Sequence, residues 1–239
     1  MKYLSIHNLD KTFTSPGGRV TQALTRISLE LGKGSILSVI GHNGSGKTTL
    51  LNCIRRSCNP DRGEILINGQ DVQKATPRMV SVYQDVDAGI IWSMTALECL
   101  TLVMSYEPSF MWSFPCRRYR DRIYKFLSSV GLAERFVEFE HTLASDLSGG
   151  QRQQLAIVMA MLRKPELLLL DEFVANLDPA VCADVLVWSK NYIKEKQITT
   201  VMVTHDHNLA ESWSDYVLEL HEGRVVRFSK AANSEETVH

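Results

Sequence analysis

The chain has 239 residues, of which 44% are hydrophobic, and its 26 basic and 27 acidic side chains give a formal net charge of −1. This length supports one large domain or two smaller lobes with a real core. The balanced charge argues against an overall attraction to nucleic acid or to an anionic membrane, so no nucleic-acid partner is expected. The five cysteines contain no CxxC pair, which argues against a structural zinc site or a disulfide framework and favours a reducing compartment.

The N-terminal part of the chain is patterned as short strands. Residues 1–13 become polar too early for a signal peptide, so no targeting segment is expected. Apolar and polar residues alternate over 2–9 and 22–31, and residues 35–40 are mostly apolar. Residues 61–72 resemble a strand and turn with an Asn-Gly pair. This pattern predicts an antiparallel β-subdomain and one buried strand.

A glycine-rich loop follows the predicted buried strand. The segment GHNGSGKT matches the pattern G-x-x-x-x-G-K-[ST] between a predicted strand and a predicted helix. Backbone N–H groups in such a loop, together with the N-terminus of the helix, attract phosphate oxygens. We expect Lys47 to reach the β- and γ-phosphates of a nucleotide and the hydroxyl of Thr48 to bind Mg²⁺. The predicted nucleotide-binding residues of this loop are Gly41, Asn43, Gly44, Ser45, Gly46, Lys47, Thr48 and Thr49.

A long apolar segment, residues 88–114, lies in the middle of the chain and is rich in Met and aromatic side chains. It is long enough to cross a bilayer, but Glu98 and Glu107 interrupt it and Pro108 would break a helix. Thr95 and Glu98 instead form the pattern of a capping box, which predicts that a helix begins there. The expected core face of this helix is Leu97, Leu100 and Val103 or Met104.

From residue 147 onward, helical segments alternate with apolar strands. Residues 147–162 and 180–196 are predicted to be helical, and residues 166–172 and 199–205 are predicted to be strands. A further helix and a closing hairpin follow. Because helices that alternate with continuous apolar strands indicate a parallel sheet covered on both faces, the predicted fold class is α/β. We expect a P-loop NTPase core, an N-terminal antiparallel β-subdomain and a helical insertion.

Two further motifs carry candidate chemistry. Asp171 and Glu172 end a predicted strand, where Asp171 can hold a Mg²⁺ shell and Glu172 can polarise an attacking water; ordinary surface acids are the alternative. Ser148, Gly149 and Gly150 form a second glycine turn at a helix start, with Ser148 as the N-cap. The turn could simply cap the helix. Because the chain already has one phosphate loop, however, the turn also suggests a phosphate bound to another subunit.

The combined pattern resembles the ABC-type ATPases, because LSGGQ just before the strand LLLLDE looks like the signature motif of that family. The resemblance covers residues from about 4 to 227. It implies that Phe13 stacks on adenine, that Gln84 is the Q-loop glutamine and that His205 is the switch histidine. The implied cofactors are ATP and Mg²⁺. The implied catalytic residues are Glu172, His205, Gln84 and Lys47, and the implied metal-binding residues are Thr48, Gln84 and Asp171.

The resemblance also implies a head-to-tail dimer in which ATP lies between two ATPase chains, identical or different. The residues that would contact nucleotide bound to the other chain, or border it, are Ser148, Gly149, Gly150, Gln151 and Asp178. Phe173 and Asn176 depart from the common family pattern, which leaves the geometry between the subunits open. The expected organisation is one ABC ATPase domain over residues 1–230, with a helical subdomain at approximately 88–160, and a polar tail at 231–239.

An ATPase unit of this kind resembles the stand-alone subunit of a bacterial transporter, at the cytoplasmic face of the membrane. Its motifs are similar to those of importers that use lipoprotein-type binding proteins and are associated with aromatic amino acids. The alternatives are an ABC exporter for lipoproteins or peptides and a non-transport ABC ATPase. The implied partners are a multi-span permease and an extracytoplasmic binding protein.

The permease is expected to dock near residues 84–94 and on the helical subdomain. Met and aromatic side chains suit an adaptable partner surface, and those of this region are too many to bury together. The side chains concerned are Trp92, Met94, Met111 and Trp112.

Overall fold

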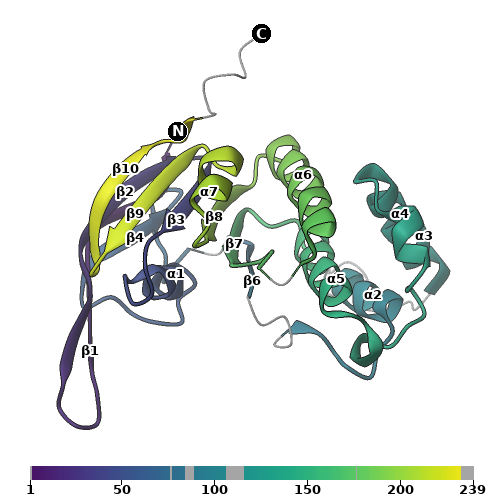
Figure 1. The fold of residues 1–239 in the computed structure, drawn as a ribbon, viewed down its shortest axis with the longest axis horizontal. Helices are drawn as coiled ribbons and strands as arrows, with labels where there is room; N and C mark the ends of the chain where they lie inside the picture. Colours follow the sequence, from purple (N-terminus) through teal and green to yellow (C-terminus); the bar gives the residue numbers. More distant parts are fainter. Residues whose placement is uncertain (1, 76, 84–88, 106–115, 176, 233–239) are drawn as a thin grey trace. The chain divides into compact units, whose positions relative to one another are not determined.

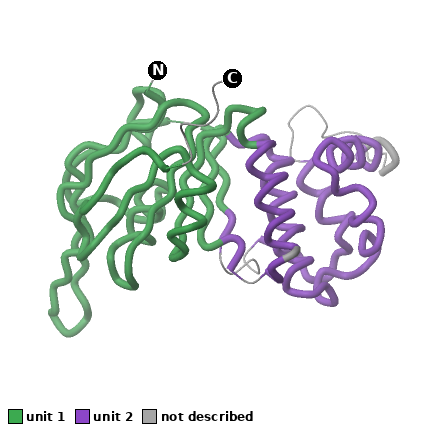
Figure 2. The backbone as a smooth tube through the Cα atoms, turned by 45° about the horizontal axis from the view of Figure 1, so that its top comes forward, with its two compact units in different colours: residues 1–81, 166–172, 193–239 green, residues 82–165, 173–192 purple. Residues whose placement is uncertain are grey.

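The computed structural model describes residues 2–75, 77–83, 89–105, 116–175 and 177–232 (Figure 1). The chain divides into two compact units, and each is assembled from segments that are distant in the sequence (Figure 2). Unit 1 contains residues 1–81, 166–172 and 193–239, and unit 2 contains residues 82–165 and 173–192.

Unit 1 contains a four-stranded antiparallel sheet in the order β2-β1-β4-β5. Its long central strand β1 pairs with β2 on one side and with β4 on the other. The inward side chains of β1, such as Leu4, Ile6 and Leu9, are fully buried. This confirms the predicted antiparallel β-subdomain. The strands are β1 (Lys2–Thr14), β2 (Val20–Gly32), β4 (Arg62–Ile67) and β5 (Gln70–Asp71).

A six-stranded sheet in the order β10-β9-β3-β8-β7-β6 forms the second layer of strands. Strand β8 pairs in parallel with β3 and β7, β9 pairs in parallel with β3, and β9 and β10 form the predicted closing hairpin. Every residue of β3 and β8 is buried, as expected for parallel strands covered on both faces. The strands are β3 (Ile36–Ile40), β6 (Met79–Val82), β7 (Leu167–Asp171), β8 (Thr199–Val203), β9 (Tyr216–His221) and β10 (Arg224–Lys230).

Two helices of unit 1 follow strands of the parallel sheet directly. Helix α1 (Lys47–Ile54) comes after β3, and helix α7 (His207–Trp213) comes after β8. Because parallel strands end at the same edge of a sheet, the loops that lead into these two helices start from one edge. The structure confirms the predicted α/β fold class.

Unit 2 is mainly helical, and its first helix begins where the sequence predicts. The backbone N–H of Thr95 donates to Oε2 of Glu98 at 2.8 Å, and the N–H of Glu98 donates to Oγ1 of Thr95 at 3.3 Å, which confirms the capping box. The predicted core side chains Leu97, Leu100, Val103 and Met104 are buried. The helices are α2 (Ala96–Ser105), α3 (Cys116–Ser129), α4 (Ala133–Val137), η3 (Ala144–Asp146), α5 (Gly149–Leu162) and α6 (Pro179–Glu195), the last of which continues into unit 1.

The apolar middle segment is only partly covered by the described residues. Helix α2 contains ten residues and ends at Ser105, whereas Met111 and Trp112 lie outside the described part of the chain. Across the residues that the structure describes, none of the helices combines the length and the apolar character needed to cross a bilayer.

Candidate functional site

The glycine-rich loop connects β3 to α1 and requires glycine at its two ends. Gly41 and Gly46 have φ angles of 143° and 103°, in a region that other residues rarely adopt. A Cβ atom at Gly41 would lie 2.2 Å from the backbone oxygen of Leu220, and one at Gly46 would lie 2.6 Å from that of Ala23. The loop backbone therefore packs directly against the neighbouring strands, without room for side chains at these points.

Helix α1 begins without a side-chain cap. Its N-cap is Gly46, no side chain bonds to the amides at this end, and its first turn contains no acidic residue. The backbone N–H groups at a helix start carry partial positive charge and bind anions when nothing else occupies them. Ser45 adds a buried hydroxyl that has no hydrogen-bond partner among the described residues. This end of α1 therefore fits a phosphate group.

Lys47, the first residue of α1, holds its ammonium group over this same loop. Its Nζ donates to the backbone oxygens of Gly41 at 2.7 Å and His42 at 3.0 Å. Burial lowers the pKa of Lys47, while Glu172 and Asp171 favour its charged form. Within the described part of the chain, the partners of the buried ammonium are carbonyl groups and nearby carboxylates, and a phosphate could provide stronger partners.

Asp171 ends strand β7, with most of its side chain shielded from solvent. Burial raises the pKa of Asp171, and the nearby guanidinium of Arg55 acts in the opposite direction. No group of three or more His, Cys, Asp or Glu side chains with the arrangement of a metal site occurs among the described residues. Mg²⁺ is usually held by one or two carboxylates together with substrate phosphates rather than by a full protein cage. The single carboxylate of Asp171 therefore fits Mg²⁺ that arrives with a nucleotide.

Glu172 follows Asp171 in an unusual backbone conformation. Its φ angle is 46°, which is the left-handed region, and its N–H donates to the backbone oxygen of Val203 at 3.0 Å. Left-handed geometry at a residue other than glycine costs roughly 1 kcal/mol and is frequent at functional sites. His205 lies beyond the end of β8, and its Nδ1 is 3.5 Å from Oε1 of Glu172.

Sheet topology brings four predicted site residues of unit 1 to one edge. Strands β3, β8 and β7 are neighbours and run in parallel (Figure 1). Lys47 comes after the first of these strands, His205 after the second, and Asp171 and Glu172 at the end of the third. Open α/β sheets bind ligands at this carboxyl edge.

The second glycine turn lies in unit 2 and caps helix α5. Oγ of Ser148 accepts a hydrogen bond from the N–H of Gln151 at 3.2 Å, and Oε1 of Gln151 accepts one from the N–H of Ser148 at 2.9 Å. This confirms Ser148 as the N-cap. Ser148 and Gly149 are exposed, and Gly150 is partly exposed. The turn therefore presents a capped but open helix start to solvent.

The other predicted site residues are distributed over both units. Phe13 lies on β1 in unit 1 with 45% of its surface exposed, and Nζ of Lys11 is 5.4 Å from the centroid of its ring. Asp178 lies in unit 2 just before α6. Gln84 and Asn176 lie outside the described residues. Thr48, Thr49, Asn43 and Gly44 all lie in or directly after the glycine-rich loop.

The sequence analysis missed one contact in each unit. In unit 1, Nη2 of Arg55 lies 3.5 Å from Oδ2 of Asp171, and in unit 2, Nε2 of the buried Gln153 donates to the backbone oxygen of Phe173. The aromatic side chain of Phe173 is fully buried. The pair of arginines after an apolar helix was the only sequence signal for Arg55.

The loop before α2 exposes the predicted docking residue Trp92. Its backbone oxygen accepts from the N–H of Ser145 at 3.3 Å, and the oxygen of Met94 accepts from the N–H of Ala144 at 2.8 Å. The guanidinium carbon of Arg152, at the start of α5, lies 5.4 Å from the centroid of the Trp92 ring. The exposed ring is therefore held by the segment that carries the second glycine turn.

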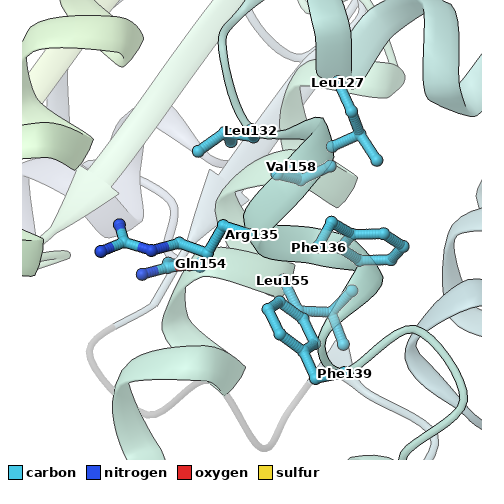
Figure 3. A pocket seen from close by; sticks show the side chains of 8 residues that line it. All are labelled: Leu127, Leu132, Arg135, Phe136, Phe139, Gln154, Leu155 and Val158. Carbon is cyan, nitrogen blue, oxygen red and sulfur yellow. The ribbon is translucent and has the colours of Figure 1, made fainter.

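A small cavity of about 10 Å³, large enough for a single water molecule, lies in unit 2 (Figure 3). Its wall is apolar except for Arg135 and Gln154, whose polar ends point to the same side in Figure 3. The cavity is therefore too small to hold a cofactor. The remaining lining residues are Leu127, Leu132, Phe136, Phe139, Leu155 and Val158.

Comparisons with known proteins agree with these observations. A family model described as ABC transporter matches residues 24–175. The chain is 34% identical to a tyrosine transport ATP-binding protein of Clostridioides difficile, over 93% of this chain and 90% of that protein. It is 32% identical to the phosphonates import ATP-binding protein PhnC of Treponema denticola, over 93% of this chain and 88% of that protein. The solved dimeric, post-hydrolysis structure of the ATP-binding cassette MJ0796 with ADP and Pi is similar with a TM-score of 0.81, at 28% identity over 95% of this chain and 98% of that one.

Proposed function

Because the chain belongs to the ABC transporter family of ATP-hydrolysing proteins, we propose that it energises solute import through separate membrane subunits. The observation that carries this proposal is the meeting of Lys47, Asp171, Glu172 and His205 at one edge of the parallel sheet. Import is supported because two relatives at more than 30% identity are named for tyrosine transport and for phosphonates import. An amino acid is the proposed solute.

The phosphate loop is proposed to bind ATP through Lys47. Its ammonium exchanges two carbonyl partners, on Gly41 and His42, for the more strongly accepting β- and γ-phosphate oxygens. The unoccupied N–H groups at the start of α1 add further donors. The exposed ring of Phe13 is the proposed platform for the adenine base.

Hydrolysis is assigned to the carboxyl ends of β7 and β8. Thr48 and Asp171, together with Gln84, are the proposed holders of Mg²⁺. When it is bound, the ion neutralises charge on the phosphates. Glu172 is aimed by its left-handed backbone and polarises the attacking water. His205 lies 3.5 Å from Glu172 and would also hold the γ-phosphate oxygens, and so would order the reacting groups.

A second copy of the ATPase is the proposed partner at the second glycine turn. Ser148 and Gly149 are exposed at a helix start, where an anion is favoured. The turn has no lysine of its own, so it complements a phosphate already bound to another chain. The residues proposed to serve this interface are Ser148, Gly149, Gly150, Gln151 and Asp178. Closure of the dimer around ATP, and reopening after hydrolysis, would switch the membrane subunits.

The exposed loop before α2 is the proposed contact with the permease. Trp92 is exposed, although it is large and apolar, and it is held at the surface by Arg152. The proposed location is the cytoplasmic face of the membrane, where the chain binds the permease as a peripheral subunit. An extracytoplasmic binding protein completes the proposed system.

Glu172→Gln tests this function directly. The amide cannot take a proton from water, so we expect ATP to bind normally while steady-state phosphate release falls by at least about 100-fold. ATP should also shift the variant to a dimer in size-exclusion chromatography. Glu166→Gln, at the other end of β7, is the matched control and should hydrolyse ATP normally. Wild-type turnover by Glu172→Gln would exclude Glu172 as the base.

The transport role needs a separate experiment. Affinity purification of the chain from detergent-solubilised membranes should recover a multi-span protein. Recovery of ribosomes or DNA in its place would contradict the proposal. Uptake of labelled tyrosine and of a labelled phosphonate, compared between cells with and without the intact chain, would then identify the solute.

A further inference from the structure

A guanidinium group contacts the carboxylate that the proposed function assigns to Mg²⁺. Nη2 of Arg55 lies 3.5 Å from Oδ2 of Asp171. Only 8% of the Arg55 side chain and 17% of the Asp171 side chain are exposed to solvent. Both residues belong to unit 1. A charged pair that is this well shielded is screened much less by water and salt than a surface ion pair.

Helix α1 explains how Arg55 reaches this carboxylate. The helix spans eight residues, which is about 12 Å, and Arg55 is the capping residue at its C-terminal end. Side chains on a helix lean toward its N-terminus, so a long side chain from the last turn extends back along the helix. The N–H of Arg55 still bonds to the oxygen of Leu51 at 2.9 Å, which fixes its backbone in helical register.

Asp171 therefore has cationic neighbours from both ends of one helix. Lys47 starts α1 and Arg55 follows its last residue, and both cations favour the ionised form of the Asp171 carboxyl group. Lys47 is accounted for by the phosphate loop. Arg55 is not, because its guanidinium meets the metal-binding acid and not the loop.

We propose that Arg55 is a positioning residue that competes with Mg²⁺ for the Asp171 carboxylate and thereby raises the Mg²⁺ concentration needed to form the metal–nucleotide complex. This inference rests on the proposed function, because it takes Asp171 as the carboxylate that binds the ion. Arg55 would thus set the Mg²⁺ concentration at which the site binds the ion, which the acids at the strand ends do not do by themselves.

Arg55 has two opposing effects on metal binding at Asp171, and its repulsion of the ion outweighs the benefit of holding the Asp171 side chain in place. Arginine remains charged at any physiological pH, so its guanidinium repels a divalent cation that approaches the same carboxylate. That repulsion scales with the double charge of the ion and is strong in a poorly hydrated site. The opposing benefit is the restriction of a short side chain at the end of a buried strand, which has little rotational freedom to lose. Removal of the charge should therefore tighten metal binding.

The adjacent Arg56 offers a matched control. Its Nη2 donates to the backbone oxygen of Ala75 at 2.6 Å, so it anchors a loop instead of the acid. Arg56→Gln removes one positive charge from the same end of α1 as Arg55→Gln does. Arg55→Lys keeps the charge but not the guanidinium.

The experiment measures metal affinity without turnover. The sample is the full chain in excess over a non-hydrolysable ATP analogue, in buffer that contains neither divalent metal ions nor chelator. Mn²⁺ is added stepwise, and the concentration of free Mn²⁺ is measured by electron paramagnetic resonance. We expect the titration midpoint of Arg55→Gln to fall about tenfold, while those of Arg55→Lys and Arg56→Gln stay within twofold of the wild type. Metal-free binding of the analogue should be the same in all four proteins.

The outcomes separate this inference from the proposed function. A folded Arg55→Gln with an unchanged or higher midpoint would overturn the inference. If the wild type failed to bind the analogue at all, the proposed function itself would fail. If Arg55→Gln does not fold, NMR spectroscopy of the wild type tests the inference instead. The side-chain Nε–H resonance of Arg55, assigned by its absence in Arg55→Lys, should shift when Mg²⁺ is added to the nucleotide-bound protein. An unmoved resonance would equally overturn the inference.

Discussion

Nδ1 of His205 lies 3.5 Å from Oε1 of Glu172, although the two residues belong to different strand-end loops. The parallel pairing of β7 with β8 accounts for this contact, because Asp171 and Val203 are partners in register. Each strand then continues by one or two residues beyond the sheet. A shift of the register by one residue would therefore separate the two side chains.

His205→Ala tests whether this contact serves hydrolysis. If His205 binds the γ-phosphate as proposed, loss of the imidazole removes a hydrogen-bonding group from the reacting phosphate. We then expect kcat to fall roughly 100-fold, with nucleotide affinity changed less than about threefold. The measurement pairs steady-state phosphate release with equilibrium binding of a fluorescent ATP analogue. His207→Ala, two residues further on at the exposed start of α7, should behave like the wild type. Equal losses in affinity and kcat would indicate a role in binding instead.

Lys47→Ala should weaken nucleotide binding. Loss of the ammonium group leaves two backbone carbonyl groups without their donor. It also removes the positive charge that is proposed to bind the phosphates, so we expect ATP affinity to fall by at least about tenfold. Isothermal titration calorimetry with ATP measures this. The exposed Lys33→Ala serves as the control for loss of one charge from unit 1. Retained affinity in Lys47→Ala would remove Lys47 from the binding site.

Two glycines of the phosphate loop provide a matched pair for stability. Gly46→Ala places a Cβ atom 2.6 Å from the oxygen of Ala23, whereas Gly44→Ala meets nothing within 4 Å. Both positions have positive φ angles, which cost any alanine about 1 kcal/mol. We expect Gly46→Ala to lose a further 1–3 kcal/mol, roughly, of unfolding free energy, because backbone must move. Urea denaturation measures the difference, and equal losses would show that the close packing of the loop is unimportant.

Local sequence signals predicted much of the fold because they depend on neighbouring residues. The predicted capping box at Thr95 and the predicted N-cap at Ser148 each form within one helical turn, and both are present. The apolar run before Asp171 identified a buried strand for the same reason, since a continuous run of apolar residues can be recognised without knowledge of the partner strands. The position of Glu172 directly after a strand followed from this, as did that of Lys47 at the start of the helix after another strand.

Contacts that depend on packing could not be predicted. The reach of Arg55 to Asp171 requires both the pairing of β7 in the sheet and the placement of α1 next to it. The hydrogen bond from Gln153 to the backbone of Phe173 likewise joins two residues that no local pattern relates. The left-handed backbone of Glu172 is also set by its bond to β8, since glutamate has no preference for that conformation.

Trp92→Glu tests the proposed permease contact. A charge replaces an exposed apolar ring, so we expect recovery of the membrane partner in affinity purification to fall at least about tenfold, while ATP affinity stays unchanged. The new carboxylate can pair with Arg152, the present neighbour of the ring, so the start of α5 should keep its conformation. Val187→Glu, on an exposed apolar residue of α6, is the control and should leave recovery unaffected. Trp92→Phe should retain most of the binding. If Trp92→Glu lowered both the recovery of the membrane partner and the affinity for ATP, a docking role would be contradicted, because the substitution would then have damaged the fold of unit 2.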